Sequence, residues 1–115
     1  MLLPVDLKDG QGEVVTSLKL TTRAMMSLEG AFSKPVAEVL EVLDGNPKVS
    51  DIVKVVSHVM DGGKGVKETE AMDMIDQAGG LFHVMPLFAE AVKRAFPAAS
   101  EGEAEGNVKK PPKKK

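Results

Sequence analysis

The stretch Val49-Ser-Asp-Ile-Val-Lys-Val-Val-Ser-His-Val-Met60 carries the clearest structural signal in the sequence. Its apolar residues recur at intervals of three and four, which predicts a helix with one broad buried stripe. Ser50 is expected to cap the first turn, and Gly62-Gly63 to end the helix after about three turns. Other elements must cover the stripe, and no residue in this helix suggests chemistry. The expected inward residues are Val49, Ile52, Val53, Val56, Val59 and Met60, with Asp51, Lys54, Ser57 and His58 outside the stripe.

Four further segments have helical patterns. They begin at Thr21 or Thr22 and near residues 35, 68 and 81, and they end near residues 33, 44, 77 and 96. Gly79 is expected to close the third of these helices in the left-handed conformation, and Pro86 to kink the last helix or mark its true start. The expected inward residues are Ala24, Met25, Leu28, Ala31 and Phe32, then Val36, Val39, Leu40 and Leu43, then Ala71, Met72, Ile75 and Ala78, and finally Leu81, Val84, Met85, Phe88, Val92 and Phe96.

The first 20 residues have a different pattern. Segments 3–8 and 13–20 flank the glycine-bearing connection Asp9-Gly10-Gln11-Gly12, which predicts a β-hairpin. Val14, Thr16, Leu18 and Leu20 share one face of the second strand. Because an isolated hairpin is marginally stable in water, it must lie on the helices or pair with another chain. We therefore predict a mainly α fold with a small N-terminal β-hairpin (α+β), a compact bundle of about five short helices within a single domain of residues 1–97.

Composition excludes several classes of protein. The 115 residues are 43% apolar and contain no Cys, Trp or Tyr. A disulfide framework, a thiolate metal site and a Cys nucleophile are therefore impossible. No apolar run approaches the roughly 18 to 20 residues that cross a bilayer, and the first residues lack the basic flank of a signal peptide. We expect a cytoplasmic protein without a membrane partner.

Charge is unevenly distributed along the chain. The net charge is −2, but residues 1–100 carry 10 Lys and Arg against 14 Asp and Glu. An acidic body is a poor surface for a phosphate backbone, so any nucleic acid would bind the C-terminal segment. Residues 98–115 are rich in Glu and Gly and then in Lys and Pro, a composition typical of disorder. The candidate polyanion contacts in this segment are Lys109, Lys110, Lys113, Lys114 and Lys115, for which a solvated tail is the simpler interpretation.

No group of residues points to catalysis. His58 and His83 lack the spacing of a zinc-binding His-Glu-x-x-His motif. Segment 62–65 lacks the phosphate-loop spacing, so we expect a flexible connection. We predict a protein that is not an enzyme and has neither cofactor nor metal. A solvated helix face explains the remaining acidic cluster better than acid–base chemistry does; its members are Glu68, Glu70, Asp73 and Asp76.

Methionine is abundant for a chain with so few aromatic residues. Met side chains fill irregular cores and also coat adaptable binding surfaces. Exposed apolar side chains that contact a partner are one interpretation, and an intramolecular core is the other. The candidate partner-binding residues are Met25, Met26, Leu28 and Phe32 on the first helix and Phe82, Met85 and Phe88 on the last.

Residues 13–96 resemble the small tail assembly chaperones of long-tailed phages, and in particular the tail protein of that type in gene transfer agents and prophages. The resemblance is carried by Leu18-Lys-Leu-Thr-Thr-Arg-Ala-Met-Met-Ser-Leu-Glu29 after the hairpin, by Val49-Ser-Asp-Ile-Val-Lys-Val-Val, by Gly79-Gly80-Leu81 and by the closing helix. It covers about three quarters of the chain and depends on the order and spacing of the segments. The family does not normally need a basic terminus.

The resemblance implies a non-enzymatic protein made in a bacterial host cell. Such a protein coats the long tape measure protein and keeps it soluble until tail tube subunits polymerise around it. Its expected partners are the tape measure and tail tube proteins, and we expect a homo-oligomer. In many such phages a longer form arises by ribosomal frameshifting, for which the codons of the terminal lysines are a candidate slippery tract.

A second class of function remains open. The protein could instead be a small nucleic-acid-binding or regulatory protein that acts through its basic C-terminal segment, although nucleic acid is the less favoured partner. Its affinity would then fall steeply with salt.

Overall fold

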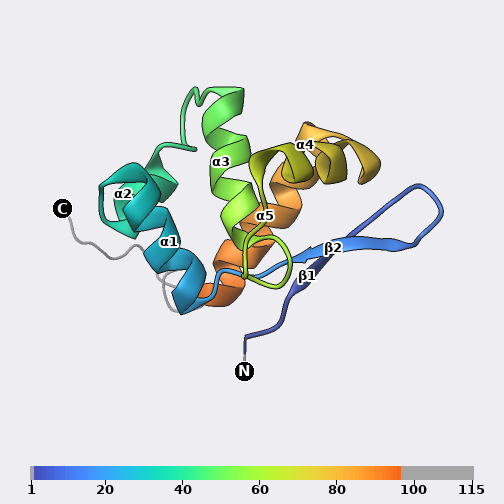
Figure 1. Cartoon of the computed structure of the whole chain (residues 1–115), viewed down its shortest axis with the longest axis horizontal. Helices are drawn as coiled ribbons and strands as arrows, with labels where there is room; N and C mark the ends of the chain where they lie inside the picture. Colours follow the sequence, from blue (N-terminus) through green and yellow to red (C-terminus); the bar gives the residue numbers. More distant parts are fainter. Residues whose placement is uncertain (1, 97–115) are drawn as a thin grey trace, which may run out of the picture.

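The computed structural model describes residues 2–96, which form a two-stranded hairpin followed by five helices (Figure 1). The predicted α+β fold is therefore confirmed. The predicted disorder of residues 98–115 lies outside the described residues. The elements are β1 (Val5–Lys8), β2 (Val14–Leu18), α1 (Thr22–Phe32), α2 (Val36–Glu41), α3 (Val49–Val59), α4 (Glu68–Gln77) and α5 (Leu81–Ala95).

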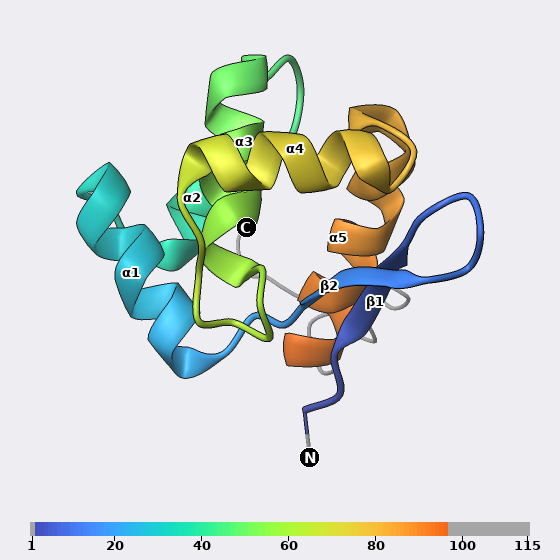
Figure 2. The same cartoon turned by 45° about the vertical axis from the view of Figure 1, so that its right-hand side comes forward.

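The hairpin lies against the helices along only part of its length. Val5 pairs with Leu18, and both side chains are buried. Figure 2 shows the turn of the hairpin extending beyond α5. At this end Val14 is 56% exposed, so the predicted inward face stops short of the turn. The turn is closed locally, because the Asp9 carboxylate accepts hydrogen bonds from the backbone N–H groups of Gln11 and Glu13.

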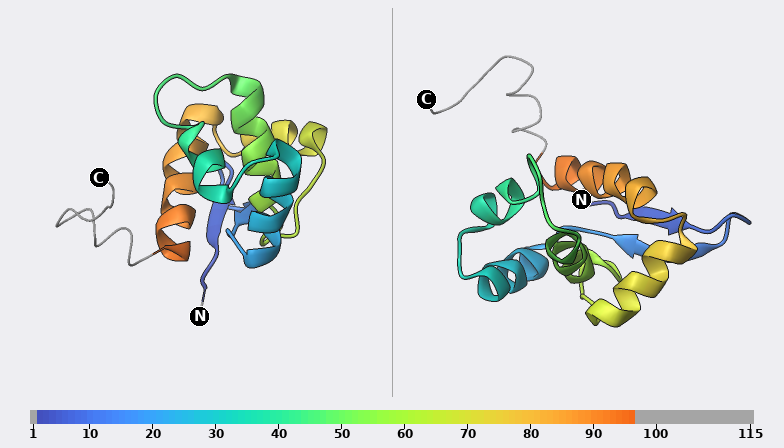
Figure 3. Two further views of the ribbon diagram at one scale, coloured as in Figure 1. Left: turned by 90° about the vertical axis from the view of Figure 1, so that its left-hand side faces the viewer. Right: turned by 90° about the horizontal axis from the view of Figure 1, so that it is seen from above.

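Both strands contact α5, and β2 also contacts α3 and α4. The view from above shows the hairpin beside these helices (Figure 3). The connection between α3 and α4 bonds to the outer edge of β2, since Gly62 N–H donates to the Ser17 carbonyl and Lys19 N–H donates to the Val59 carbonyl. The hairpin is thus stabilised within the chain, the first of the two possibilities that its sequence left open.

Helix α3 lies at the centre of the molecule, in contact with α1, α4 and β2. Because it is covered on several sides, its buried surface is wider than the predicted stripe. Val55 is inaccessible to solvent and Ser57 is 2% exposed, although neither was expected inside. The Ser57 hydroxyl donates to the Lys54 carbonyl at 2.8 Å, so this polar group is satisfied. Conversely, Val49 is 62% exposed because it begins the helix beyond the contacts with its neighbours.

The helix ends only partly match the predicted boundaries. Thr21 caps α1, its hydroxyl accepting a hydrogen bond from Ala24 N–H, as expected. Ser50 makes no such bond, because α3 begins immediately after Lys48 and Ser50 lies inside the helix. Helix α2 begins after Pro35 but ends at Glu41, and residues beyond it continue as turns.

The last two helices meet at a glycine turn. Gly79 has φ +109°, so it ends α4 as predicted. Met72 is 46% exposed and Met74 is partly buried, so the sequence pattern assigned the wrong methionine of α4 to the interior. α5 starts at Leu81 and runs through Pro86, whose missing N–H removes one hydrogen bond of the helix.

The connection from Met60 to Val66, which the sequence predicts to be flexible, makes several backbone hydrogen bonds. Gly65 N–H donates to the Met60 carbonyl, and Val66 N–H donates to the Ser57 carbonyl. Gly63 has φ +93° and packs against Thr21, where a side chain would not fit. This connection therefore joins the hairpin, α1 and α3.

Candidate protein-binding surfaces

The seven apolar residues proposed as partner contacts lie in two separate groups. Four are on α1 and three are on α5. Figures 2 and 3 show α1 and α5 on either side of α3. The fold therefore does not combine the two groups into one surface patch.

Exposure differs sharply within each group. On α1, Met26 is 69% exposed, Met25 and Phe32 are partly buried, and Leu28 is inaccessible. Leu28 thus lies in the core and offers no side-chain surface. The amine of Lys54 lies 4.7 Å from the centre of the Phe32 ring, so this ring is partly covered by a cation.

The residues of α5 show the same range. Phe82 is 90% exposed, Met85 is partly buried, and Phe88 is only 4% exposed. Phe88 is therefore a core residue that belongs to the buried hydrophobic cluster. The exposure of Phe82 follows from its place in the first turn of α5, on the side of the helix opposite Val84 and Phe88.

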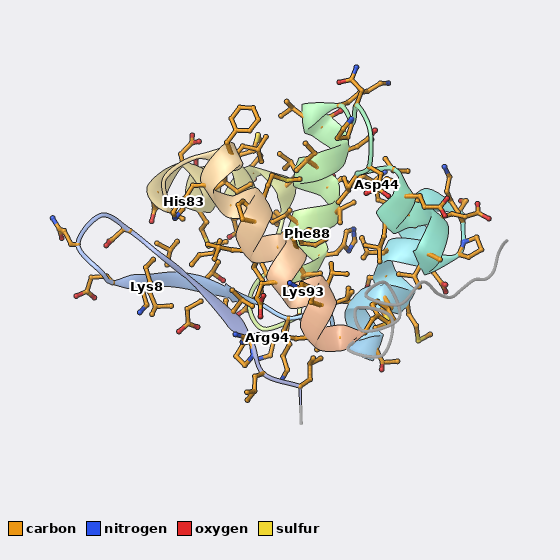
Figure 4. All side chains as sticks on the ribbon, turned by 180° about the vertical axis from the view of Figure 1, so that it is seen from behind. Lys8, Asp44, His83, Phe88, Lys93 and Arg94 are labelled. Atoms are coloured by element: carbon orange, nitrogen blue, oxygen red, sulfur yellow. The ribbon has the colours of Figure 1, made fainter. Side chains whose placement is uncertain are left out.

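A groove of about 470 Å³ lies between α2 and α5, and sequence reasoning did not identify it as a site. In the rear view of Figure 4, Phe88 lies on α5 and Asp44 lies to one side of it, toward α2. Two separate sequence signals pointed to parts of the groove: the apolar stripe of the short α2 segment, which was assigned to the interior, and Met85 and Phe88 of α5, which were proposed as partner contacts. Its lining residues are Ala37, Leu40, Glu41, Leu43, Asp44, Met85, Phe88, Ala89 and Val92.

A second depression, of about 480 Å³, lies between β2 and α4 and carries carboxylates. Glu70 and Asp73 belong to the acidic cluster of α4, all four members of which are exposed. Glu70 also accepts a hydrogen bond from Lys67 N–H, which caps the helix. These groups form a solvated acidic face, as the sequence predicted.

Burial and neighbouring charge lower the pKa of His58. Burial lowers its pKa by disfavouring the imidazolium, the positive charge of Lys54 lowers it further, and Glu68 opposes both effects. It lines an open depression with Lys64, Lys67 and Glu70. His83 packs against Gly79 in the first turn of α5, and it is not among the residues that line this depression.

Within residues 2–96, no three His, Asp or Glu side chains are grouped so that they could hold a metal ion. No helix in this range is long and apolar enough to cross a bilayer. The five candidate lysines lie outside the described residues; they are Lys109, Lys110, Lys113, Lys114 and Lys115.

Comparison with protein-family models, with curated proteins and with solved structures finds no match to this chain.

Proposed function

We propose that this protein is a non-enzymatic tail assembly chaperone of the phage type. It would bind a tape measure protein in the cytoplasm of a bacterial host cell and keep it soluble until tail tube subunits assemble around it. The proposal is supported by the resemblance of residues 13–96 to that family. The observation that carries it is the large apolar surface of Phe82, which is 90% exposed.

A chaperone for a long helical client needs many weak apolar contacts. Isolated exposed apolar residues are common on soluble proteins. Phe82 supports the proposal because, at 90%, it is the most exposed large apolar side chain among residues 2–96. Met26, 69% exposed on α1, offers a second contact on another side of the molecule. Two contacts on different sides suit a protein that coats a long chain in many copies, because linked weak contacts give strong overall binding.

The other proposed contact residues have lesser roles in this scheme. Met25, Phe32 and Met85 are partly buried and can contribute the edges of the apolar surfaces. Leu28 and Phe88 support these surfaces from within the core. Repeated binding along the client also favours a homo-oligomer of the chaperone.

The competing function, nucleic-acid binding through the C-terminal lysines, is opposed by the charge of the folded part. Residues 2–96 carry 10 basic and 14 acidic side chains. Such a body repels phosphates, so any binding would depend on the lysines alone and would fall steeply as salt is raised.

Co-expression tests the proposed function. The client is a tape measure protein, a long helical protein that the proposal expects to be encoded near this gene, and the readout is the soluble fraction of that client. We expect the wild-type protein to increase it and the double variant Met26→Ser/Phe82→Ser to do so much less. Val49→Ser is the matched control, because Val49 is 62% exposed but lies outside the proposed contacts.

Two outcomes would count against the chaperone. The first is a client that is equally soluble with the wild-type protein, with the double variant and with no partner. The second is salt-sensitive binding of DNA or RNA that disappears when the five lysines are replaced by Gln, which would favour the competing function.

A further inference from the structure

The groove between α2 and α5 combines an apolar floor with an acidic rim. Leu40, Leu43 and Val92 are partly buried side chains on the floor, whereas Glu41 and Asp44 are exposed at the rim. Segment 35–47 contains no Lys or Arg, and Lys34 and Lys48 flank it. Within residues 2–96, neither rim carboxylate takes part in a salt bridge. The groove is thus suited to a segment that carries an apolar side chain next to positive charge.

The groove lies beside the point at which the chain leaves the described fold. Val92 is a lining residue, and Phe96 N–H donates to its carbonyl at 3.0 Å, so the groove ends about one helical turn before residue 97. From Met85 to Val92 the groove follows about 10 Å of α5. The sequence that follows Phe96 begins with the Ala-, Gly- and Glu-containing segment 97–107 and continues as Val108-Lys-Lys-Pro-Pro-Lys-Lys-Lys.

We propose that segment 108–115 binds in the α2–α5 groove of the same molecule, with Val108 on the apolar floor and Lys109 and Lys110 beside Glu41 and Asp44. This inference goes beyond the proposed function and does not depend on it. It gives a role to the basic segment, which the resemblance to tail assembly chaperones does not explain.

The length of the intervening segment suits this contact. A Gly-containing chain with the length of segment 97–107 spans about 18 Å on average, enough to turn back along the groove. A tether of that length gives a local concentration in the millimolar range. Because exposed ion pairs are individually weak and are screened by salt, binding should depend on the tether and decrease at high ionic strength.

The other large group of carboxylates is less well placed. Only the C-terminal end of α4 joins the start of α5, whereas residue 97 follows the far end of this helix of about 22 Å. Glu70, in the first turn of α4, lines a depression with His58 of α3. The acidic segment 101–105 would also have to cross the molecule to bring the lysines there. The α2–α5 groove is therefore the favoured site.

Paramagnetic relaxation in the full-length chain tests the proposal. The sequence has no Cys, so Asn107→Cys provides a single attachment point for a nitroxide label. At low salt we expect loss of amide signal for Leu40, Leu43 and Ala89. The loss should disappear at about 1 M salt, where the Debye length is about 3 Å. In a mixture of labelled and separately ¹⁵N-enriched molecules, no loss should occur, because the contact is intramolecular.

Charge exchange provides the specific control. Lys109→Glu/Lys110→Glu should abolish the signal loss without changing any residue of the described fold. Glu41→Lys/Asp44→Lys, which changes the rim of the groove, should abolish the signal loss as well. The combination of all four changes should restore it. Glu70→Lys/Asp73→Lys, on α4, is the matched control and should leave the pattern unchanged.

Three results would overturn the proposal. They are signal loss centred on α4, signal loss spread evenly over residues 2–96 or absent from them, and signal loss transferred between molecules in the mixed sample. The last result would assign the groove to a second copy of the chain.

Discussion

The Arg94 guanidinium, in the last turn of α5, donates a 2.7 Å hydrogen bond from Nη1 to the carbonyl oxygen of Pro4, which lies immediately before β1. Its Nε is 3.1 Å from the Glu90 carboxylate one turn earlier, which holds the side chain in place. Residues 90 positions apart are thus joined at the open end of the hairpin. This contact helps to keep β1 against α5.

Arg94→Ala should lower the free energy of unfolding by about 1 kcal/mol, because one hydrogen bond to a backbone carbonyl is lost. Glu90→Ala should lower it by at most about 0.5 kcal/mol, since an exposed ion pair within one helix contributes little. Urea unfolding of the two variants measures the difference. Equal effects of the two changes would show that the bond to Pro4 contributes nothing.

Gly63 should be far more sensitive to substitution than another glycine with a similar backbone conformation. A Cβ at Gly63 would lie 2.6 Å from Thr21 Cγ2 and 2.8 Å from the Lys19 carbonyl oxygen, whereas Gly45, at φ +83°, has open space around it. Gly45→Ala isolates the cost of positive φ, about 1 kcal/mol. Gly63→Ala adds a steric clash and should cost about 3 kcal/mol in total.

Thermal and urea unfolding measure both glycine variants. A Gly63→Ala variant no less stable than Gly45→Ala would mean that the connection between α3 and α4 can move away from Thr21. It would then be the flexible link that the sequence predicted.

Two valines of α3 test the revised assignment of its buried face. Val55 is inaccessible to solvent, so Val55→Ala should lower the free energy of unfolding by about 2 kcal/mol through lost burial and the cavity left behind. Val49 is 62% exposed, so Val49→Ala should change it by no more than about 0.5 kcal/mol. Urea unfolding measures both changes. A larger loss of stability for Val49→Ala than for Val55→Ala would support the buried stripe predicted from the sequence.

These valines also show how far sequence reasoning extends. The positions of the five helices and the hairpin were predictable, because helical periodicity and the Gly and Pro boundaries are local properties. Periodicity gives the direction of a buried face but not its width. Val55 and Ser57 are buried because α3 has neighbours on several sides, and that arrangement is set by long-range packing.

The candidate surfaces were less predictable for the same reason. Leu28 and Met26 are both apolar residues of one helix, yet the first is inaccessible and the second is 69% exposed. The sequence does not state which residues another helix covers. The α2–α5 groove also depends on two helices that meet only in three dimensions, although each apolar stripe was recognised separately.

His58 should make stability depend on pH. Burial and the charge of Lys54 lower its pKa below the ordinary value of 6.5, although Glu68 partly opposes this effect. As the pH falls from above 6.5 toward the lowered pKa of the folded state, the unfolded chain binds more protons, so the free energy of unfolding decreases. Below the lowered pKa, His58 is protonated in both the folded and the unfolded state. The stability that its neutral form provides at higher pH is then fully lost.

Urea unfolding between about pH 5 and pH 8 measures this effect. The wild-type protein should lose more stability on acidification than His58→Gln, which lacks the titrating group. Lys54→Gln removes one cause of the shift, so an NMR titration of the imidazole should give a higher pKa in that variant than in the wild type. Identical pH dependence in wild type and His58→Gln would mean that the folded state does not disfavour the imidazolium, contrary to the partly buried position of this ring.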